Sequence, residues 1–348
     1  MDKRVLMRGN DAIAEAAIRS GCRYYFGYPI TPQNELTAYM AKRMPEVKGT
    51  FIQAESEIAA INMVYGAASA GQRAMTSSSG PGISLKQEGI SYLAGAELPC
   101  FYASVVRGGP GLGNIAPAQS DYFQATRGGG HGDYRVIVLA PNSVQEMADL
   151  TMLGFHLADK YRNPAMVLAD AILGQMLEPM EFKTPHFSPL PSKDWTVGNM
   201  EGRPPRLITS LFLGEGKLEK HNLELKEKYE KIQAEEVRWE DIMLDDTQIA
   251  LVAYGTCARI ARWAVIQGRA QGVKIGLCRP ITLWPFPSEF VGQLSKNVRN
   301  ILVVEMSLGQ MVEDVRLAVN GRCEVQFYGR TGGGIPTVEE ILKRVSRL

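Results

Sequence analysis

The sequence predicts an α/β fold, with a doubly wound, mainly parallel sheet followed by a second, smaller α/β domain. Short apolar runs alternate with helical patterns from Arg4 to about Leu177, and the alternation resumes near Gln248. Strands and helices that alternate in this way form a parallel sheet covered by helices on both faces. The length of 348 residues exceeds what one ordinary core requires and suits two domains with a connector.

Apolar periodicity and turn residues locate the elements of the first domain. Strands are expected at residues 23–28, 50–53, 73–77, 100–106, 135–140 and 165–169. Helices are expected at residues 11–20, 33–42, 57–70, 83–95 and 144–160. Asn10 is expected to cap the first helix, and Gly21 to end it.

A connector and a charged helix follow this domain. Residues 177–207 are rich in proline and lack periodicity, which predicts an extended connector. A helix is expected at residues 217–242, because apolar residues recur there every seven positions as one narrow stripe: Leu218, Leu225, Ile232 and Trp239. Such an arm could pack on its own body or bind a partner.

The second domain shows the same alternation on a smaller scale. Its strands are expected at residues 249–254, 273–278, 300–304 and 324–327. Its helices are expected at residues 258–269, 288–295, 310–319 and 338–347. We therefore divide the chain into a first domain at residues 1–190, a connector with a helical arm at 191–246, and a second domain at 247–348.

Composition argues against several classes of protein. The 38 basic and 37 acidic residues are mixed along the chain, so no surface for nucleic acid is indicated. No stretch approaches the roughly 18 to 20 apolar residues of a membrane span, and the first residues lack the apolar core of a signal peptide, so a cytoplasmic protein is expected. The five cysteines are scattered without a CxxC pair, which argues against an iron–sulfur cluster or a metal site on this chain.

The turn from Tyr28 to Pro32 joins the first predicted strand to the helix after it. It places the hydroxyl of Thr31 at the carboxyl end of a strand, where open α/β sheets bind ligands. Thr31 is also expected to N-cap the following helix, with Pro32 at its first position. A capped turn without chemistry is the alternative interpretation.

Two acids, Glu55 and Glu57, follow the second strand and open an alanine-rich helix. Acidic residues at a helix N-terminus gain roughly 0.3 to 1 kcal/mol from the macrodipole, and we interpret Glu55 in this way. In a cleft lined by small residues, Glu57 could share a proton with a heterocyclic nitrogen. Thiamine diphosphate requires such a carboxylate, because a glutamate bonded to N1′ of its aminopyrimidine favours the imino tautomer, which removes the proton from C2.

Polar and flexible segments follow the next strands. The turn from Thr76 to Gly82 has hydroxyls and free amides that could hold an anion or a polar ring edge. Arg107 follows the fourth strand and opens a glycine-rich loop, where it suits capture of a carboxylate or a surface salt bridge. Long irregular connections such as residues 108–133 are usually functional or mobile, and His131 in this loop is either structural or part of a site.

Together the segments YPITPQNE, QAESEIAAINMVYGAASAG, TSSSGPG, AGAELP, RGGPGLG and GGGHGD closely resemble the α subunit of 2-oxoacid:ferredoxin oxidoreductases. The nearest resemblance is to the separate-subunit type that acts on 3-methyl-2-oxobutanoate or 2-oxoglutarate. It covers essentially the whole chain. It implies a thiamine diphosphate pyrimidine-binding domain first and a transketolase C-terminal-like domain second, with the latter including the segment from Gly329 to Gly333.

The resemblance also implies roles for individual residues. Thr31 would contact the 2-oxoacid, Glu57 would bind N1′ of thiamine diphosphate, and Arg107 would bind the substrate carboxylate. His131 and Asp133 match a segment close to the site. Further cofactor contacts are expected from the two turns, at Pro29, Ile30, Ser78 and Ser79.

The resemblance implies an incomplete active site on this chain. The family grips the cofactor diphosphate and Mg²⁺ through a GDG motif, which is absent here, so a β subunit would carry that site and the iron–sulfur cluster. Gamma and ferredoxin-like delta subunits, ferredoxin and CoA are the further partners implied. The reaction implied is oxidative decarboxylation of a 2-oxoacid to acyl-CoA and CO₂ with reduction of ferredoxin.

Two other functions are compatible with parts of the sequence. A thiamine enzyme without redox chemistry, such as a transketolase or decarboxylase half, would turn over without an electron acceptor. An assembly subunit with the fold but no chemistry would not need Thr31, Glu57 and Arg107. The substrate stays open, because Gln33 and Asn34 differ from the small hydroxyl residues found in many relatives.

Overall fold

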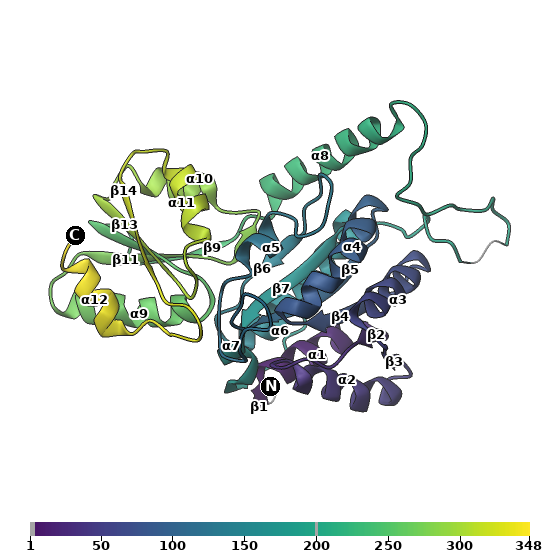
Figure 1. Ribbon diagram of the computed structural model, residues 1–348, viewed down its shortest axis with the longest axis horizontal. Coiled ribbons are helices and arrows are strands. Elements are labelled where there is room, and N and C mark those ends of the chain that lie inside the picture. The colour runs from purple at the N-terminus through teal and green to yellow at the C-terminus, as the bar shows by residue number, and fades with distance from the viewer. Residues whose placement is uncertain (1–3, 199–200) are drawn as a thin grey trace.

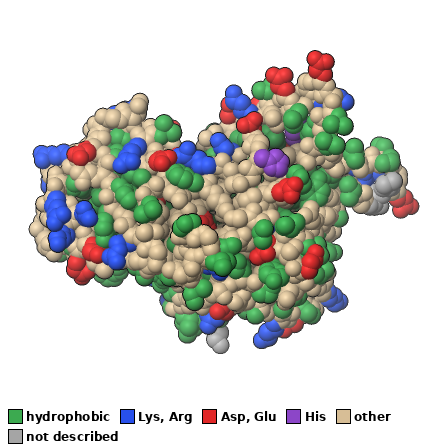
Figure 2. Space-filling model, viewed as in Figure 1, with side chains coloured by type: hydrophobic (Ala, Val, Ile, Leu, Met, Phe, Trp, Pro, Cys, Tyr) green, Lys and Arg blue, Asp and Glu red, His purple; other side chains and the backbone are tan. Residues whose placement is uncertain are grey.

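The computed structural model describes residues 4–198 and 201–348 (Figure 1). Its elements form two α/β units that lie side by side, with a long helix along the first unit. Basic and acidic side chains occur over both units on the face shown in Figure 2. No helix in the described ranges combines the length and the apolar character needed to span a membrane. The α/β class with mainly parallel sheets confirms the predicted fold class.

The first unit contains, within the described chain, a seven-stranded sheet in the order β12-β6-β7-β5-β4-β2-β3. β5 and β7 lie at its centre and are buried along their whole length, as expected of parallel strands covered on both faces. The six parallel strands are those that the sequence predicts: β2 (Tyr24–Gly27), β3 (Thr50–Gln53), β4 (Ala74–Ser78), β5 (Cys100–Val106), β6 (Ile137–Leu139) and β7 (Pro164–Asp170).

Helices cover both faces of this sheet. α1 (Gly9–Arg19) packs between α2 (Asn34–Glu46) and α6 (Val144–Tyr161), whereas α3 (Glu57–Ser69) packs against α4 (Gly80–Gly95). Right-handed crossovers place the two groups on opposite faces, because the chain runs one way from β2 to β3 and the other way from β3 to β4 and β5. The strand order therefore reverses between β2 and β4, which makes their carboxyl ends the topological switch point.

The second unit contains a five-stranded sheet in the order β14-β13-β10-β11-β9 within the described chain. Four strands are parallel and were predicted: β10 (Ile249–Val252), β11 (Ile275–Pro280), β13 (Asn300–Glu305) and β14 (Glu324–Gly329). α9 (Gly255–Ala270) packs with α12 (Val338–Val345), and α10 (Ser288–Leu294) packs with α11 (Met311–Val319). The edge strand β9 (Trp239–Ile242) runs antiparallel to β11 and was not expected.

One strand crosses from the second unit to the first. β12 (Thr282–Trp284) follows β11 directly, yet it pairs antiparallel with β6 at the edge of the seven-stranded sheet. Buried polar contacts reinforce the junction. The Gln119 side chain donates to the carbonyl oxygen of Tyr254 and accepts from the amide of Met306, both at 2.9 Å. Two short helices, α5 (Tyr122–Thr126) and α7 (Ala171–Gln175), complete this region.

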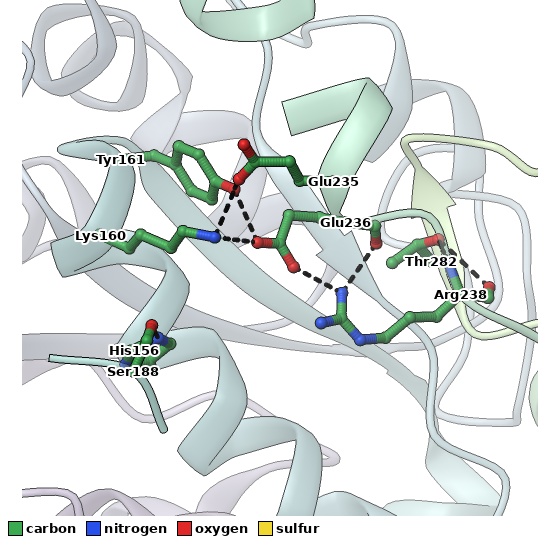
Figure 3. Close-up of polar contacts among 8 residues, drawn as sticks. All are labelled: His156, Lys160, Tyr161, Ser188, Glu235, Glu236, Arg238 and Thr282. Atoms are coloured by element: carbon green, nitrogen blue, oxygen red, sulfur yellow. Dashed lines mark hydrogen bonds and ion pairs between the residues drawn. The ribbon is translucent and has the colours of Figure 1, made fainter. Parts of the chain in front are cut away.

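The charged helix α8 (Lys217–Glu235) packs on its own body through its C-terminal half. Leu225, Tyr229 and Ile232 are buried, whereas Leu218 and Leu223 near the start are about half exposed. A polar cluster anchors the end of the helix (Figure 3): the Tyr161 hydroxyl lies 2.6 Å from the carboxylates of both Glu235 and Glu236, and Lys160 pairs with Glu236 at 2.7 Å.

The predicted end of this helix at residue 242 is wrong. The helix ends at Glu235, and Trp239 belongs to β9, where its backbone pairs with β11. The prediction extended the helix because the seven-residue spacing of apolar residues includes Trp239, but sheet hydrogen bonds hold that segment in an extended conformation. The Glu236 carboxylate also binds Arg238 at 2.8 Å, which ties the extended segment to the helix end.

Two boundaries in the first unit also differ from the prediction. The expected connector begins with a strand, β8 (Leu177–Met180), which pairs antiparallel with β1 (Val5–Arg8) at residues that lack clear periodicity. Asn10 does not cap α1, because the helix begins at Gly9 with Arg8 at the N-cap. The Asn10 side chain instead donates to the carbonyl oxygen of Pro32 at 2.8 Å.

Candidate functional site

The turns singled out in the sequence meet at one edge of the first sheet. The segment from Tyr28 to Pro32 follows β2, the serine-rich turn follows β4, and Arg107 follows β5. β2 pairs with β3 and β4, and β4 pairs with β5, so the carboxyl ends of these strands are adjacent. Because the switch point lies between β2 and β4, this edge is where an open α/β sheet binds ligands.

Glu57 is the first residue of α3. The hydroxyl of Ser56 caps this helix by accepting from the amide of Ala59 at 3.2 Å, which fixes where α3 begins. Glu57 is only 7% exposed, and within the described chain its carboxylate has no hydrogen bond or ion pair. Acidic side chains are seldom buried without a partner, so this carboxylate is available to a ligand.

Gly82 in α4 makes room for Glu57. A Cβ at this position would collide with the Ser78 hydroxyl and would lie 2.6 Å from Oε1 of Glu57. The start of α3, the end of β4 and the first turn of α4 therefore converge on one point. These three segments can approach one another only because residue 82 is a glycine, since any side chain would occupy the space between them.

Buried polar atoms without a hydrogen-bond partner gather at the same edge. Twelve such side-chain atoms occur among the described residues, and eight of them lie in β4 and β5 or in the connections after β2, β4 and β5: Gln33 Nε2, Thr76 Oγ1, Ser78 Oγ, Ser79 Oγ, Ser104 Oγ, Arg107 Nε, Ser120 Oγ and Asp121 Oδ2. Buried polar groups are nearly always hydrogen-bonded. The concentration of such atoms makes this edge the candidate binding site, because a polar ligand there would meet donors and acceptors that the chain leaves free.

A buried hydrogen-bond network lies beneath this edge. The Tyr25 hydroxyl bonds to Ser77 Oγ at 2.7 Å and Thr37 Oγ1 at 2.9 Å, and Ser77 donates to Gln33 Oε1 at 2.5 Å. Burial raises the pKa of Tyr25 to about 12, so its hydroxyl stays neutral. The network holds the Gln33 amide through its oxygen and leaves Nε2 as a free donor.

Arg107 reaches the turn after β2. Its Nη1 donates to the carbonyl oxygen of Thr31 and its Nη2 to that of Leu112, both at 3.1 Å. The structure thus brings together Arg107 and Thr31, which the sequence separates by 76 residues. The guanidinium is half-buried, and its remaining N–H groups can meet a carboxylate.

The prediction that Thr31 caps α2 is wrong. The helix begins at Asn34 with Gln33 at the N-cap, and the Gln33 side chain makes no capping bond. The amide of Gln33 donates to the carbonyl oxygen of Ile30 at 3.1 Å, which closes a turn over Thr31 and Pro32 before the helix can start. The Thr31 hydroxyl accepts from Asn34 Nδ2 at 3.1 Å instead.

Asp121 lies at the same edge, although it is not among the candidate site residues that the sequence indicated. Its Oδ2 lies 3.5 Å from the position of a Cβ on Gly80, at the start of α4, and has no partner. Burial raises the pKa of Asp121 to about 6. No local pattern marked this carboxylate, because its burial results from the fold of the connection after β5.

The remaining predicted residues divide between this sheet edge and other surfaces. Ser78 and Ser79 are fully buried at the end of β4, whereas Pro29 is exposed and Ile30 is half-buried in the turn after β2. His131 and Asp133 line a hollow of about 430 Å³ against α8, with Tyr92, Phe212 and His221. Neither of them is among the unpartnered groups at the sheet edge.

A loop of the second unit reaches the Arg107 loop. Asn114 Nδ2 donates to the carbonyl oxygen of Gly332 at 3.1 Å, and a Cβ on Gly333 would lie 2.6 Å from the Ala116 Cβ. The glycine-rich segment from Gly329 to Gly333 is thus placed beside the candidate site.

Possible metal ligands do not gather in the described part of the chain, where no group of three or more His, Cys, Asp or Glu side chains could hold an ion. All five cysteines are free, and four are buried. Burial raises the pKa of Cys22, Cys100 and Cys278 to about 12.

Two family descriptions match this chain. Residues 15–243 match pyruvate flavodoxin/ferredoxin oxidoreductase, thiamine diP-bdg, and residues 247–341 match pyruvate:ferredoxin oxidoreductase core domain II. Ketoisovalerate oxidoreductase subunit VorB of Methanothermobacter marburgensis is 52% identical over 99% of this chain and 97% of that protein. The 2-oxoglutarate synthase subunit KorA of Methanothermobacter thermautotrophicus is 37% identical over 100% of both proteins.

Solved structures show the same relationship. The 2-oxoglutarate:ferredoxin oxidoreductase from Magnetococcus marinus, with 2-oxoglutarate, coenzyme A and succinyl-CoA bound, matches 99% of this chain with a TM-score of 0.90 and 28% identity. This chain spans 65% of the length of that chain. A split-gene transketolase shares the fold, with a TM-score of 0.61 and 13% identity over 98% of this chain and 97% of that one. The chain therefore belongs to the family of 2-oxoacid:ferredoxin oxidoreductase subunits, of the type that carries the thiamine diphosphate-binding domain.

Proposed function

We propose that this chain is the alpha subunit of a thiamine diphosphate-dependent oxidoreductase that converts a 2-oxoacid and CoA to acyl-CoA and CO₂ while it reduces ferredoxin. The observation that carries the proposal is the buried Glu57 carboxylate against Gly82, surrounded by unpartnered polar atoms. A buried carboxylate beside neutral donors and acceptors fits a polar heteroaromatic ring. The Arg107 guanidinium at the same edge fits a substrate carboxylate.

Each residue has a separate task in this proposal. Glu57 holds a proton at N1′ of the pyrimidine, and Ser78, Ser79, Pro29 and Ile30 contact the ring or its surroundings. When bound, thiamine diphosphate supplies the nucleophilic carbon and the electron sink for decarboxylation. Arg107 binds the carboxylate of the 2-oxoacid, and Thr31 orients the keto group from the adjacent turn. No role at this sheet edge is proposed for His131 and Asp133, because they line the hollow against α8.

The site is proposed to be completed by other subunits. A β subunit would grip the cofactor diphosphate through Mg²⁺ and carry an iron–sulfur cluster, because this chain has no GDG motif. Gamma and ferredoxin-like delta subunits, in a cytoplasmic complex, would pass electrons to ferredoxin. Within the chain, residues 1–190 would hold the pyrimidine, residues 191–246 would form the connector and arm, and residues 247–348 would form the transketolase C-terminal-like domain.

The substrate proposed first is 3-methyl-2-oxobutanoate. Identity is higher to the two ketoisovalerate oxidoreductase subunits, at 52 and 53%, than to the 2-oxoglutarate synthase subunits compared, at 37 or 38%. The second candidate is 2-oxoglutarate, which is bound in the Magnetococcus marinus structure. A dicarboxylate needs a cation for its distal carboxylate in addition to Arg107, whereas a branched apolar side chain does not.

An acceptor-coupled assay of the co-purified complex tests the proposal. We expect reduction of ferredoxin or a viologen dye that requires CoA, thiamine diphosphate and a 2-oxoacid. The kcat/KM should be higher for 3-methyl-2-oxobutanoate than for pyruvate, 2-oxoglutarate or indolepyruvate. Glu57→Gln should lower kcat by roughly 10²- to 10⁴-fold without loss of assembly. Turnover without any electron acceptor, or full activity of Glu57→Gln, would contradict the assignment.

A further inference from the structure

Lys86 is a buried lysine that the chemistry described so far does not use. It lies in α4, is 0% exposed, and has its ammonium 3.5 Å from the carbonyl oxygen of Ser77. No carboxylate lies within ion-pair distance of it in the described ranges. An ammonium has three donors and is expensive to bury without a negative partner. A lysine in this position therefore serves a purpose other than packing.

The position of Lys86 in α4 relates it to Glu57. Lys86 follows Gly82 by four residues in α4, so the two lie on the same face of the helix. Gly82 touches both Glu57 and Ser78, and the carbonyl that binds the ammonium belongs to Ser77, directly before Ser78. Lys86 thus follows by one helical turn the residue at which Glu57 meets α4.

The electrostatics agree with this geometry. Burial lowers the pKa of Lys86 to about 8, and the Glu57 carboxylate is the one charge in the described structure that raises it again. The Ser77 carbonyl, which accepts from the ammonium, and the Ser78 hydroxyl beside Gly82 are uncharged. A second carboxylate, Asp121, faces Gly80 at the start of α4. Glu57 is therefore the opposite charge that acts on the buried Lys86 ammonium, and it does so without a contact ion pair.

We propose that Lys86 is a positioning residue whose buried ammonium attracts the Glu57 carboxylate and keeps it directed at the sheet edge, ready to accept the pyrimidine of thiamine diphosphate. This inference rests on the proposed function. The ammonium offsets the desolvation of the carboxylate without forming a contact ion pair. The carboxylate oxygens stay free for the cofactor, which a direct salt bridge would prevent.

A double-mutant cycle in the purified complex tests the inference. The variants are Lys86→Met, which keeps the length of the side chain but removes the charge, Glu57→Gln, and the two together. The readouts are the dissociation constant of thiamine diphosphate in the presence of Mg²⁺, from fluorescence quenching, and the near-ultraviolet circular dichroism of the bound aminopyrimidine. Lys228→Met is the matched control, because Lys228 is a partly buried lysine in α8 paired with Glu97 at 3.2 Å.

We expect Lys86→Met to weaken cofactor binding about tenfold and to reduce the imino-tautomer signal. The double variant should bind no more weakly than Glu57→Gln alone, because Lys86 acts only through that carboxylate. It should also melt at a higher temperature than Glu57→Gln, which leaves the ammonium unpaired. Lys228→Met should leave the dissociation constant unchanged.

Three results would overturn the inference: native cofactor binding by Lys86→Met, losses that multiply in the double variant, or failure of Lys86→Met and Lys86→Gln to assemble at all. The last result would show that the fold needs Lys86 whatever residue 57 is. Absence of thiamine diphosphate binding by the native complex is a different outcome. It would contradict the proposed function, while the melting temperatures of the four proteins would still measure the coupling between Lys86 and Glu57.

Discussion

Arg107 Nη1 lies 3.1 Å from the carbonyl oxygen of Thr31 and donates a hydrogen bond to it, which joins the turn after β2 to the loop after β5. β4 lies between these two strands in the sheet. The guanidinium therefore passes over the end of β4, where Ser78 and Ser79 are buried. Because two carbonyl oxygens orient the guanidinium, its direction is fixed before any substrate arrives.

Removal of this guanidinium should affect substrate binding first. Arg107→Ala should raise the KM for the 2-oxoacid roughly 10- to 100-fold, since hydrogen bonds to charged groups are worth about 1.5–3 kcal/mol. Arg107→Lys should recover only part of the loss, because an ammonium cannot present a planar pair of donors. Steady-state kinetics of the complex measure both effects. Arg347→Ala, at an exposed position near the C-terminus, is the control, and an unchanged KM in Arg107→Ala would exclude the carboxylate role.

Two glycine-to-alanine substitutions in adjacent helices should differ in their effect: one should weaken cofactor binding, and the other should stabilise the protein. Gly82→Ala places a methyl group on Ser78 and 2.6 Å from Glu57 Oε1, so thiamine diphosphate binding should fall at least tenfold. Gly66→Ala, in the adjacent helix α3, meets no atom within 4 Å and should stabilise the protein by about 0.4–1 kcal/mol. Cofactor titration and thermal denaturation distinguish the pair. Equal cofactor affinity in the two variants would show that the space at Gly82 is not needed.

The buried Asp121 carboxylate should make stability depend on pH. Its pKa of about 6 lies above the value near 4 in the unfolded chain, so the folded protein binds the extra proton. Stability should therefore fall as the pH rises from about 4 to 6. Asp121→Asn should raise the free energy of unfolding at pH 7 by about 1–2 kcal/mol and should have no effect on it below pH 4. The expected gain is smaller than the full pKa difference would give, because the Asp121 side chain is partly exposed.

Denaturation at a series of pH values checks this prediction. Asp194→Asn serves as the control, because Asp194 is an exposed carboxylate in the connector. A pH profile of Asp121→Asn that runs parallel to that of the native protein would contradict the assignment of this window to Asp121.

The junction between the two units should depend on Gln119. Gln119→Ala leaves the Tyr254 carbonyl and the Met306 amide without their buried partner, which should lower the free energy of unfolding by about 2–5 kcal/mol. Gln271→Ala, at an exposed position, should change it by less than about 0.5 kcal/mol. Urea denaturation gives both values, and equal values would mean that other contacts hold the units together.

The parallel strands of both sheets were predictable because each is a short apolar run bounded by turn residues. The strands that escaped prediction, β1, β8, β9 and β12, form only where a distant segment offers a partner. β8 even contains Pro179, which the edge of a two-stranded sheet tolerates. Likewise the end of α8 is set by the pairing of β9 with β11 and by the contacts of Glu236, neither of which leaves a periodic signal.

The candidate site divides in the same way. The residues around Thr31, Glu57 and Arg107 follow predicted strands, and the topology of a parallel sheet brings strand ends together without further information. Asp121 and Lys86 could not be identified from the sequence, because what marks them is the burial of a charged side chain, and burial depends on which segments cover it. Thr31 shows the limit of local rules, because the hydrogen bond from Gln33 to Ile30 closes a turn where a helix cap was expected.

The strand β12 has a consequence for dissecting the protein. A fragment that ends near residue 243, where the first family match stops, would lack β12 and leave β6 as a bare sheet edge. Unpaired edges recruit strands from other molecules, so such a fragment is expected to self-associate when expressed alone. The point at which the chain changes from one family description to the next is thus not a point at which it can be cut.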